Sequence, residues 1–133
     1  MMLIVHAGCM ITGFTIVTTG AMVAKFLRAR TWWLKVHRRL GLTGPLCVFA
    51  GFVMAYIMVS FYDGDHFAVR HAYMGLLSVL FAFMTPILGI LQFRLIEYAS
   101  VIRVMHRWSG RITVLVMLVT IISGLIFANI IRF

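Results

Sequence analysis

Residues 3–24 read LIVHAGCMITGFTIVTTGAMVA, and no charged residue occurs among them. A helix of about 20 apolar residues crosses the roughly 30 Å hydrocarbon core of a bilayer. This stretch therefore predicts a transmembrane helix over residues 3–27, with His6 near its start and Gly13 and Gly20 on its later turns. The same combination of apolar span, histidine and small residues recurs along the rest of the chain.

Three further stretches are apolar enough to span a membrane, and they predict helices over residues 33–62, 67–93 and 102–131. The chain has 133 residues, of which 63% are hydrophobic and 11% are charged. Soluble domains carry about 25% charged residues, so the bilayer must be the solvent here. Because the connections are short, consecutive helices should be antiparallel neighbours. The expected fold is an all-α membrane protein, a four-helix transmembrane antiparallel bundle that forms one domain over residues 1–133. Cys9 and Cys47 are expected towards opposite membrane faces, which argues against a disulfide.

The formal charge of +9 does not indicate a nucleic-acid partner, because the basic residues cluster between the apolar spans. If the membrane face of the N-terminus is called side A, the first and third connections lie on side B. Side A carries Arg70 and Arg132, beside Asp63 and Asp65. By the positive-inside rule side B faces the cytoplasm and both termini lie outside, in the plasma membrane or the inner membrane if the protein is prokaryotic. The ten basic residues of side B are Lys25, Arg28, Arg30, Lys35, Arg38, Arg39, Arg94, Arg103, Arg107 and Arg111.

Each predicted span holds one histidine near its own start: His6, His37, His71 and His106. Because the helices alternate in direction, His6 and His71 should lie near side A, and His37 and His106 near side B. A histidine inside a membrane span is costly unless it has a function. Two imidazoles at one depth can bind one iron from both faces of a porphyrin. The pattern predicts two b-type haems, one near each face, with these four histidines as the iron ligands.

Small residues follow each histidine on the same helical face, at steps of four, seven, fourteen and eighteen residues, and only Met10 among these sixteen positions is large. A flat macrocycle beside a helix requires missing side chains, and glycine lets the backbone approach closely. The alternative is helix packing, because small residues also let membrane helices approach one another. In order of step, the positions are Met10, Gly41, Gly75 and Gly110; Gly13, Gly44, Ser78 and Thr113; Gly20, Gly51, Thr85 and Thr120; and Ala24, Ala55, Gly89 and Gly124. We expect the glycines at steps four, seven and fourteen, together with Gly124, to contact haem.

The fourth span reads HRWSG at residues 106–110 and ISGL at 122–125, and RTWWLKVH occupies residues 30–37. At these residues the chain resembles the cytochrome b561 superfamily, including the core that is fused in some members to an extracellular DOMON module. The family's four haem histidines lie on four consecutive helices and pair first with third and second with fourth. The resemblance therefore implies that His6 pairs with His71 and His37 with His106. Familiar eukaryotic members carry one further helix on each side of this core.

The resemblance also implies that a donor binds through basic residues near the cytoplasmic haem, where Lys35 and Arg103 lie. Both could instead follow the positive-inside rule alone, or, with Arg70, pair with haem propionates. His66 lies in the polar loop before the third span, where it could compete with His71 or serve an outer substrate site. We favour a solvated loop histidine at this position.

These observations lead to a hypothesis of transmembrane electron transfer through two bis-histidine haems. The chain would link a cytoplasmic-side or quinol donor to an acceptor or partner across the membrane. A quinol-like or ascorbate-like donor would make it a transmembrane oxidoreductase. The expected partners are the bilayer and a quinone, a small reductant or a cytochrome or other redox subunit, and a dimer or a larger complex stays open. One alternative is a haem- and quinone-binding membrane anchor of a larger redox enzyme; another is a haem-free transporter that moves protons or metal ions through histidines.

Overall fold

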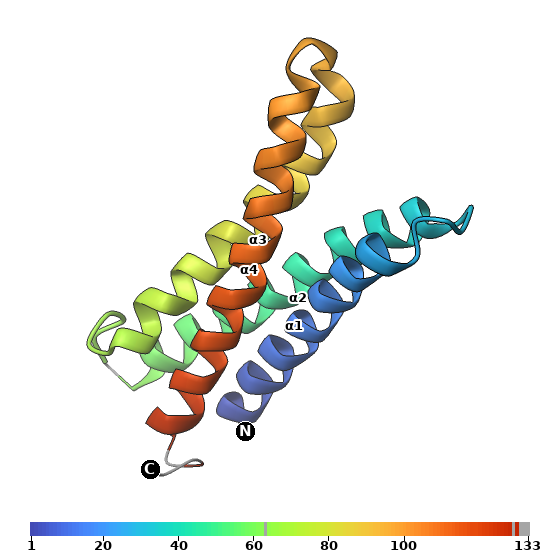
Figure 1. Cartoon of the computed structure of the whole chain (residues 1–133). Coiled ribbons are helices and arrows are strands. Elements are labelled where there is room, and N and C mark those ends of the chain that lie inside the picture. Colours follow the sequence, from blue (N-terminus) through green and yellow to red (C-terminus); the bar gives the residue numbers. More distant parts are fainter. Residues whose placement is uncertain (63, 129, 131–133) are drawn as a thin grey trace.

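A computed structural model describes residues 1–62, 64–128 and 130 of the chain, and within them the regular structure is helical. The helices are α1 (Met2–Phe26), α2 (Trp33–Phe61), α3 (Arg70–Arg94) and α4 (Ala99–Phe127), with a short 3-10 helix η1 (Ile96–Tyr98) before α4. All four long helices are apolar enough to cross a membrane. Figure 1 shows them as two antiparallel hairpins, α1–α2 and α3–α4. The predicted all-α transmembrane fold class is confirmed.

The helix boundaries differ from the predicted ones mainly in the second half of the chain. The third helix begins at Arg70 rather than near residue 67, because the Asp65 carboxylate accepts a hydrogen bond from the Phe67 amide (3.0 Å) and holds this segment as a turn. The fourth helix begins at Ala99 rather than at residue 102, because η1 leads directly into it. It ends at Phe127, and residue 131, where its end was predicted, lies outside the described residues.

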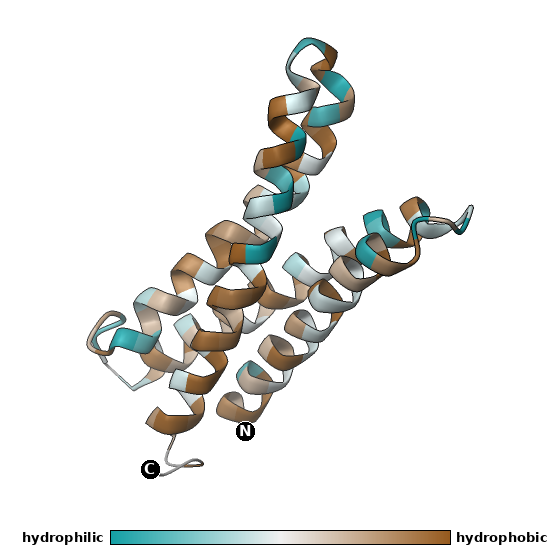
Figure 2. Ribbon diagram, in the orientation of Figure 1, coloured by the Kyte–Doolittle hydropathy of each residue, from teal (hydrophilic) through white to brown (hydrophobic). Residues whose placement is uncertain are grey.

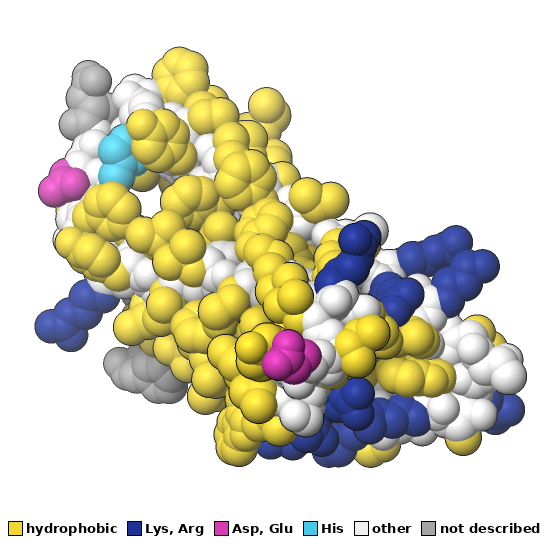
Figure 3. Space-filling model, turned by 90° about the horizontal axis from the view of Figure 1, so that it is seen from above, with side chains coloured by type: hydrophobic (Ala, Val, Ile, Leu, Met, Phe, Trp, Pro, Cys, Tyr) yellow, Lys and Arg dark blue, Asp and Glu magenta, His cyan; other side chains and the backbone are white. Residues whose placement is uncertain are grey.

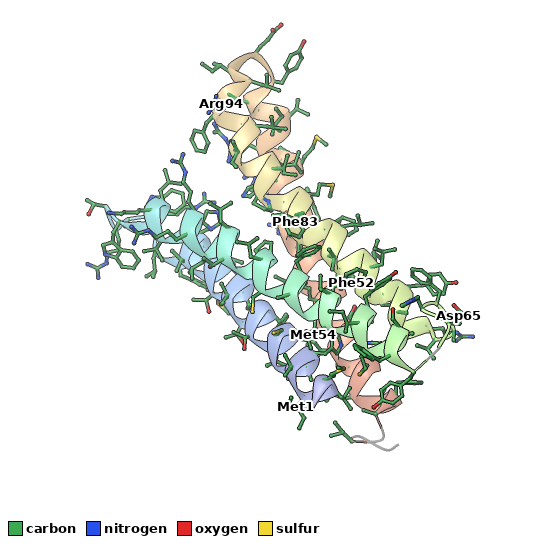
Figure 4. All side chains as sticks on the ribbon, turned by 180° about the vertical axis from the view of Figure 1, so that it is seen from behind. Met1, Phe52, Met54, Asp65, Phe83 and Arg94 are labelled. Atoms are coloured by element: carbon green, nitrogen blue, oxygen red, sulfur yellow. The ribbon has the colours of Figure 1, made fainter. Side chains whose placement is uncertain are left out.

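The two hairpins lie side by side at one end and diverge at the other (Figure 1). Figure 4 shows Met1 and Asp65 near the end where the hairpins meet, and Arg94 at the far tip of α3. The helices within a hairpin contact each other along much of their length, whereas contacts between the hairpins are fewer. The α1–α2 and α3–α4 connections lie at the diverging end, so this end is side B.

Glycines hold α1 against α2. A Cβ on residue 13 would lie 2.6 Å from Cγ2 of Val48, and one on residue 44 would lie 2.6 Å from Cγ2 of Val17. No larger residue fits at Gly13 or Gly44 without separating the helices, which is the small-residue packing known for membrane helices. This hairpin therefore depends on close backbone approach.

The register of this hairpin also brings its two cysteines together. Sγ of Cys47 lies 3.4 Å from the carbonyl oxygen of Cys9. The expectation that the two thiols lie towards opposite faces was wrong. Residue 47 is near the middle of α2, so its depth cannot be read from its distance to the nearest charged connection.

Hydroxyl groups hold α3 against α4. Thr113 is 1% exposed, and its hydroxyl lies 2.8 Å from the Thr85 hydroxyl and 2.8 Å from the Ser109 carbonyl oxygen. Closer to side A, the hydroxyls of Ser78 and Thr120 are 2.9 Å apart. In lipid, polar groups must find partners inside the protein, so this series of hydroxyl contacts both satisfies them and fixes the register of the hairpin.

A small apolar core lies between the hairpins, and apolar side chains also cover the outside. Figure 2 shows hydrophobic residues along all four helices, and Leu46, Leu80 and Leu115 are 60%, 58% and 61% exposed. Such a surface suits lipid rather than water. Figure 4 shows Phe52 and Phe83 near the region where the hairpins separate. The buried core consists of Met10, Val48, Val79 and Met117, with Phe14, Val17, Phe52 and Phe83 packed against it.

Candidate functional site

Two pairs of histidine rings face each other between the hairpins. His6 on α1 and His71 on α3 have ring centroids 6.2 Å apart, with ring planes at 87°. His37 on α2 and His106 on α4 have centroids 6.0 Å apart, with planes at 79°. The structure thus brings together the two couples that alternating helix direction implies. Each couple takes one ring from each hairpin.

The separation within each pair suits a metal ion between the two rings. Bonds from a metal to a histidine nitrogen are about 2 Å long and the ring centroid lies about 1 Å behind that nitrogen, so two rings facing one iron have centroids about 6 Å apart. Both measured separations, 6.2 and 6.0 Å, agree with this value. Perpendicular rings in direct edge contact also have centroids about 4.5–7 Å apart, so the separation gains its meaning from the hydrogen bonds that orient each ring.

In the first hairpin, each histidine is oriented by a backbone carbonyl of the neighbouring helix. Nδ1 of His6 lies 2.8 Å from the Gly51 carbonyl oxygen, and Nδ1 of His37 lies 2.9 Å from the Gly20 carbonyl oxygen. A carbonyl can only accept, so Nδ1 carries the proton and donates it. Nε2 is then left unprotonated for a metal, as is usual for metal-binding histidines.

The second hairpin repeats this arrangement with one difference. Nδ1 of His106 donates to the Thr85 carbonyl oxygen at 2.9 Å. Nδ1 of His71 instead lies 3.1 Å from the Ser123 hydroxyl, which donates to the Thr120 carbonyl oxygen at 2.9 Å. His71 is therefore oriented by a side chain, whereas the other three histidines are oriented by the backbone.

Two glycines leave room for the rings of α3 and α4. A Cβ on residue 124 would lie 2.7 Å from Cε1 of His71, and a Cβ on residue 89 would lie 3.1 Å from Cε1 of His106. Both glycines are eighteen residues after the histidine of their own helix, and each lies against the histidine of the other. A side chain at residue 124 would force the His71 ring to move, and one at residue 89 would press on the His106 ring.

The comparisons with known proteins agree with this geometry. The sequence model of the eukaryotic cytochrome b561 family matches residues 5–132, almost the whole chain. The chain belongs to the eukaryotic cytochrome b561 family. No curated protein and no solved structure matches it significantly. Membership makes the protein an integral membrane cytochrome that binds haem b and acts in transmembrane electron transfer.

In this cytochrome b561, the predicted glycine contacts fall into distinct groups. Gly13, Gly44 and Gly51 lie in the α1–α2 contact, where the other helix fills the space beside them. A Cβ at residue 51 would be only 3.0 Å from Sδ of Met10. Gly20 lies in the same contact, since a Cβ there would be 3.2 Å from Cβ of Leu40. These four glycines therefore have the helix-packing role that was the alternative to haem contact, and haem contact by them stays a prediction.

The glycines one turn after the histidines have more open surroundings. A Cβ at Gly41 or Gly75 would have no atom within 4 Å, and one at Gly110 would meet only Cγ2 of Thr85 at 3.6 Å. These positions, next to His37, His71 and His106 respectively, have the free space that a macrocycle would require. Haem contact by them stays a prediction.

The basic candidates lie on the surface of the cytochrome. Lys35, Arg70 and Arg103 are all exposed, and Arg132 lies outside the described residues. Arg38 is a further basic candidate, and its guanidinium lies 4.5 Å from the Phe93 ring centroid of the other hairpin. Its position directly after His37 is the feature of the sequence that could have identified it. A cavity of about 280 Å³ beside this contact is lined by Arg38, Ile90, Phe93 and Arg94.

His66 lies apart from the paired rings. Its imidazole stacks on Tyr56 at a centroid distance of 4.2 Å, and Nε2 lies 3.3 Å from the Ser60 hydroxyl. The ring that faces His6 is that of His71. The geometry therefore favours His71 over His66 as the partner of His6.

Proposed function

We propose that this cytochrome carries electrons across the membrane through two haems b, one held by His6 and His71 and the other by His37 and His106. The observation that supports this most strongly is the separation of about 6 Å within both ring pairs. The hydrogen bonds at Nδ1 of His6, His37 and His106, which leave Nε2 free for a metal, support it further.

The histidines and their partners would set the chemistry of both sites. Bound haem b supplies a one-electron iron couple. Two histidines on each iron leave no coordination position for oxygen, so the residues favour electron transfer alone. The hydrogen bonds at the four Nδ1 atoms hold the rings and increase the basicity of Nε2. The chain thereby contributes to the potential of each haem.

The helices would hold the two sites at different depths with a dry interior between them. On α1, fourteen residues separate His6 from Gly20, whose carbonyl orients His37, which is about 21 Å of helix. Val48 and Met117, both 0% exposed, lie in the buried core of the bundle. This packing would keep water away from the electron path.

The charge distribution supports a direction for the protein in the membrane. We place side B in the cytoplasm and both termini outside, because ten of the twelve basic residues belong to side B. Lys35, Arg38 and Arg103 would then attract an anionic small reductant, or pair with haem propionates. At side A, a quinone, a small molecule or a redox subunit would accept the electrons.

Haem stoichiometry in a matched pair of histidine variants tests this proposal. We expect two haems per chain in the native protein and in His66→Ala, and one in His71→Ala with the potential of the remaining haem retained. Pyridine haemochromogen spectra and redox titration measure both quantities. Loss of both haems in His71→Ala, or loss of one only in His66→Ala, would contradict the pairing.

A further inference from the structure

Two arginines lie on the outward side of α4, within its membrane span. Arg107 and Arg111 are one helical turn apart and both are exposed. The buried residues Ser109, Thr113 and Met117 occupy the opposite side of the helix, towards α3. Figure 3 shows that Lys and Arg side chains gather at one end of the molecule, which is the basic end of the hairpins.

Arg111 is placed unusually deep for a charged residue. It follows His106 by five residues towards side A, so it starts about 7.5 Å deeper than the His37–His106 pair. Its distance to the end of α4 at Phe127 is sixteen residues, or about 24 Å, which is less than the roughly 30 Å of a hydrocarbon core. A lipid-facing guanidinium at this depth is costly unless a partner compensates its charge.

The helix geometry indicates where that partner lies. Side chains on a helix lean towards its N-terminus, and the N-terminus of α4 is at side B. Arg107 and Arg111 therefore both extend towards the headgroups of the side B leaflet. The guanidinium of Arg111 lies 4.9 Å from the ring centroid of Trp108, which is 57% exposed. A guanidinium stacked by its face keeps its N–H edges free for a planar or phosphate acceptor.

We propose that Arg107, Trp108 and Arg111 form a binding site for the phosphodiester headgroup of an anionic phospholipid in the side B leaflet. Two guanidinium groups one turn apart match a single phosphate, and Trp108 is of the residue type favoured at the membrane interface. The same side of α4 continues towards side A as exposed Leu115, Leu118 and Ile122, which offer an apolar path to the acyl chains. This lipid site does not depend on the proposed haem ligation.

The test compares two variants with equal loss of charge on the same side of the protein. R107Q/R111Q removes the proposed site. R28Q/R30Q removes two arginines from the α1–α2 connection, where Arg28 also lies over a tryptophan ring, that of Trp33, at 5.8 Å. The full haem-loaded proteins are equilibrated with defined mixtures of phosphatidylglycerol and phosphatidylcholine, and retained lipid is counted by native mass spectrometry.

We expect R107Q/R111Q to lower retention of phosphatidylglycerol at least fivefold, with phosphatidylcholine unchanged, and R28Q/R30Q to change neither more than twofold. R111K should show an intermediate loss, because an ammonium keeps the charge but not the forked geometry. An unchanged haem spectrum verifies folding of each variant. If both double variants lost phosphatidylglycerol equally, the effect would be one of general surface charge, and the proposed site would be overturned. Dissociation of an oligomer in R107Q/R111Q, with lipid retention unaltered, would assign this surface to a protein contact and also overturn it.

Discussion

Gly124 shows how a missing side chain can determine the position of a neighbouring ring. The His71 imidazole occupies the space where a Cβ at residue 124 would lie, and the nearest ring atom would be only 2.7 Å away. Rigid ring atoms and helix backbone cannot give way at this distance, unlike the end of a flexible side chain. The Ser123 hydroxyl, one residue earlier, fixes the rotation of the same ring. Two consecutive residues thus define one proposed iron ligand.

Gly124→Ala should therefore displace His71 and selectively weaken the side A haem. We expect the haem content to fall from two towards one per chain, with the potential of the side B haem changed little. Gly8→Ala is the matched control, because a Cβ at residue 8 would have no atom within 4 Å. Redox titration of both variants provides the measurement. Full occupancy with native potentials in Gly124→Ala would mean that His71 is not held as proposed.

At the scale of single elements, the two hairpins solve the same packing problem with different chemistry. Gly13 and Gly44 bring α1 and α2 together by close approach, whereas Thr85, Ser109 and Thr113 join α3 and α4 through hydroxyl contacts. Within lipid, neither association gains from the hydrophobic effect, so van der Waals contact and hydrogen bonds must supply it. In both hairpins, however, each histidine lies against a residue of the neighbouring helix, and that residue follows the neighbouring helix's own histidine by fourteen or more positions.

Gly44→Ala should destabilise the first hairpin as a unit. The added methyl would lie 2.6 Å from Cγ2 of Val17, and overpacking of this kind costs about 1–3 kcal/mol. We expect a lower thermal midpoint and a parallel loss of both haems, because His6 and His37 share this hairpin. The double variant Gly44→Ala/Val17→Ala should recover part of the stability, which a double-mutant cycle measures. Selective loss of one haem would instead indicate direct haem contact at residue 44.

At the scale of the whole molecule, the histidine pairs connect two hairpins that otherwise contact each other sparsely. Each imidazole is oriented within its own hairpin, but each ring pair spans both hairpins. The hairpins also diverge towards side B (Figure 1). Bound haem would therefore add two links between preformed halves and stabilise their association by linkage.

This arrangement predicts that the halves assemble from separate chains when haem is present. Residues 1–62 and 64–133, co-expressed with ample haem, should co-purify as a complex with b-type absorption bands. Without haem, or with His71→Ala and His106→Ala combined in the second fragment, co-purification should fall at least tenfold. Affinity capture of one tagged fragment, followed by quantification of the other, measures this. Equally strong association of the haem-free fragments would show that packing alone joins the hairpins.

The sequence by itself determined the elements and the depth of the histidines. Apolar runs of membrane-spanning length leave no other solvent than lipid, and continuous runs of about 20 apolar residues satisfy their backbone groups there as helices. Short connections then reverse each helix, so His6 and His71 must share one depth and His37 and His106 the other. These conclusions need only chain direction and helix rise, which is why they could be predicted without coordinates.

Only the tertiary structure decided which atoms meet. The steps of fourteen residues predict space for a macrocycle, and the structure adds that the backbone carbonyls of Gly20, Gly51 and Thr85 accept hydrogen bonds from Nδ1 of a histidine. Every residue carries a carbonyl, so sequence cannot distinguish the one that is used. The register between α1 and α2, which also brings Cys47 beside Cys9, depends on how glycine gaps and branched side chains interlock across two helices. That fit is a property of surfaces in three dimensions, and no spacing along one chain encodes it alone.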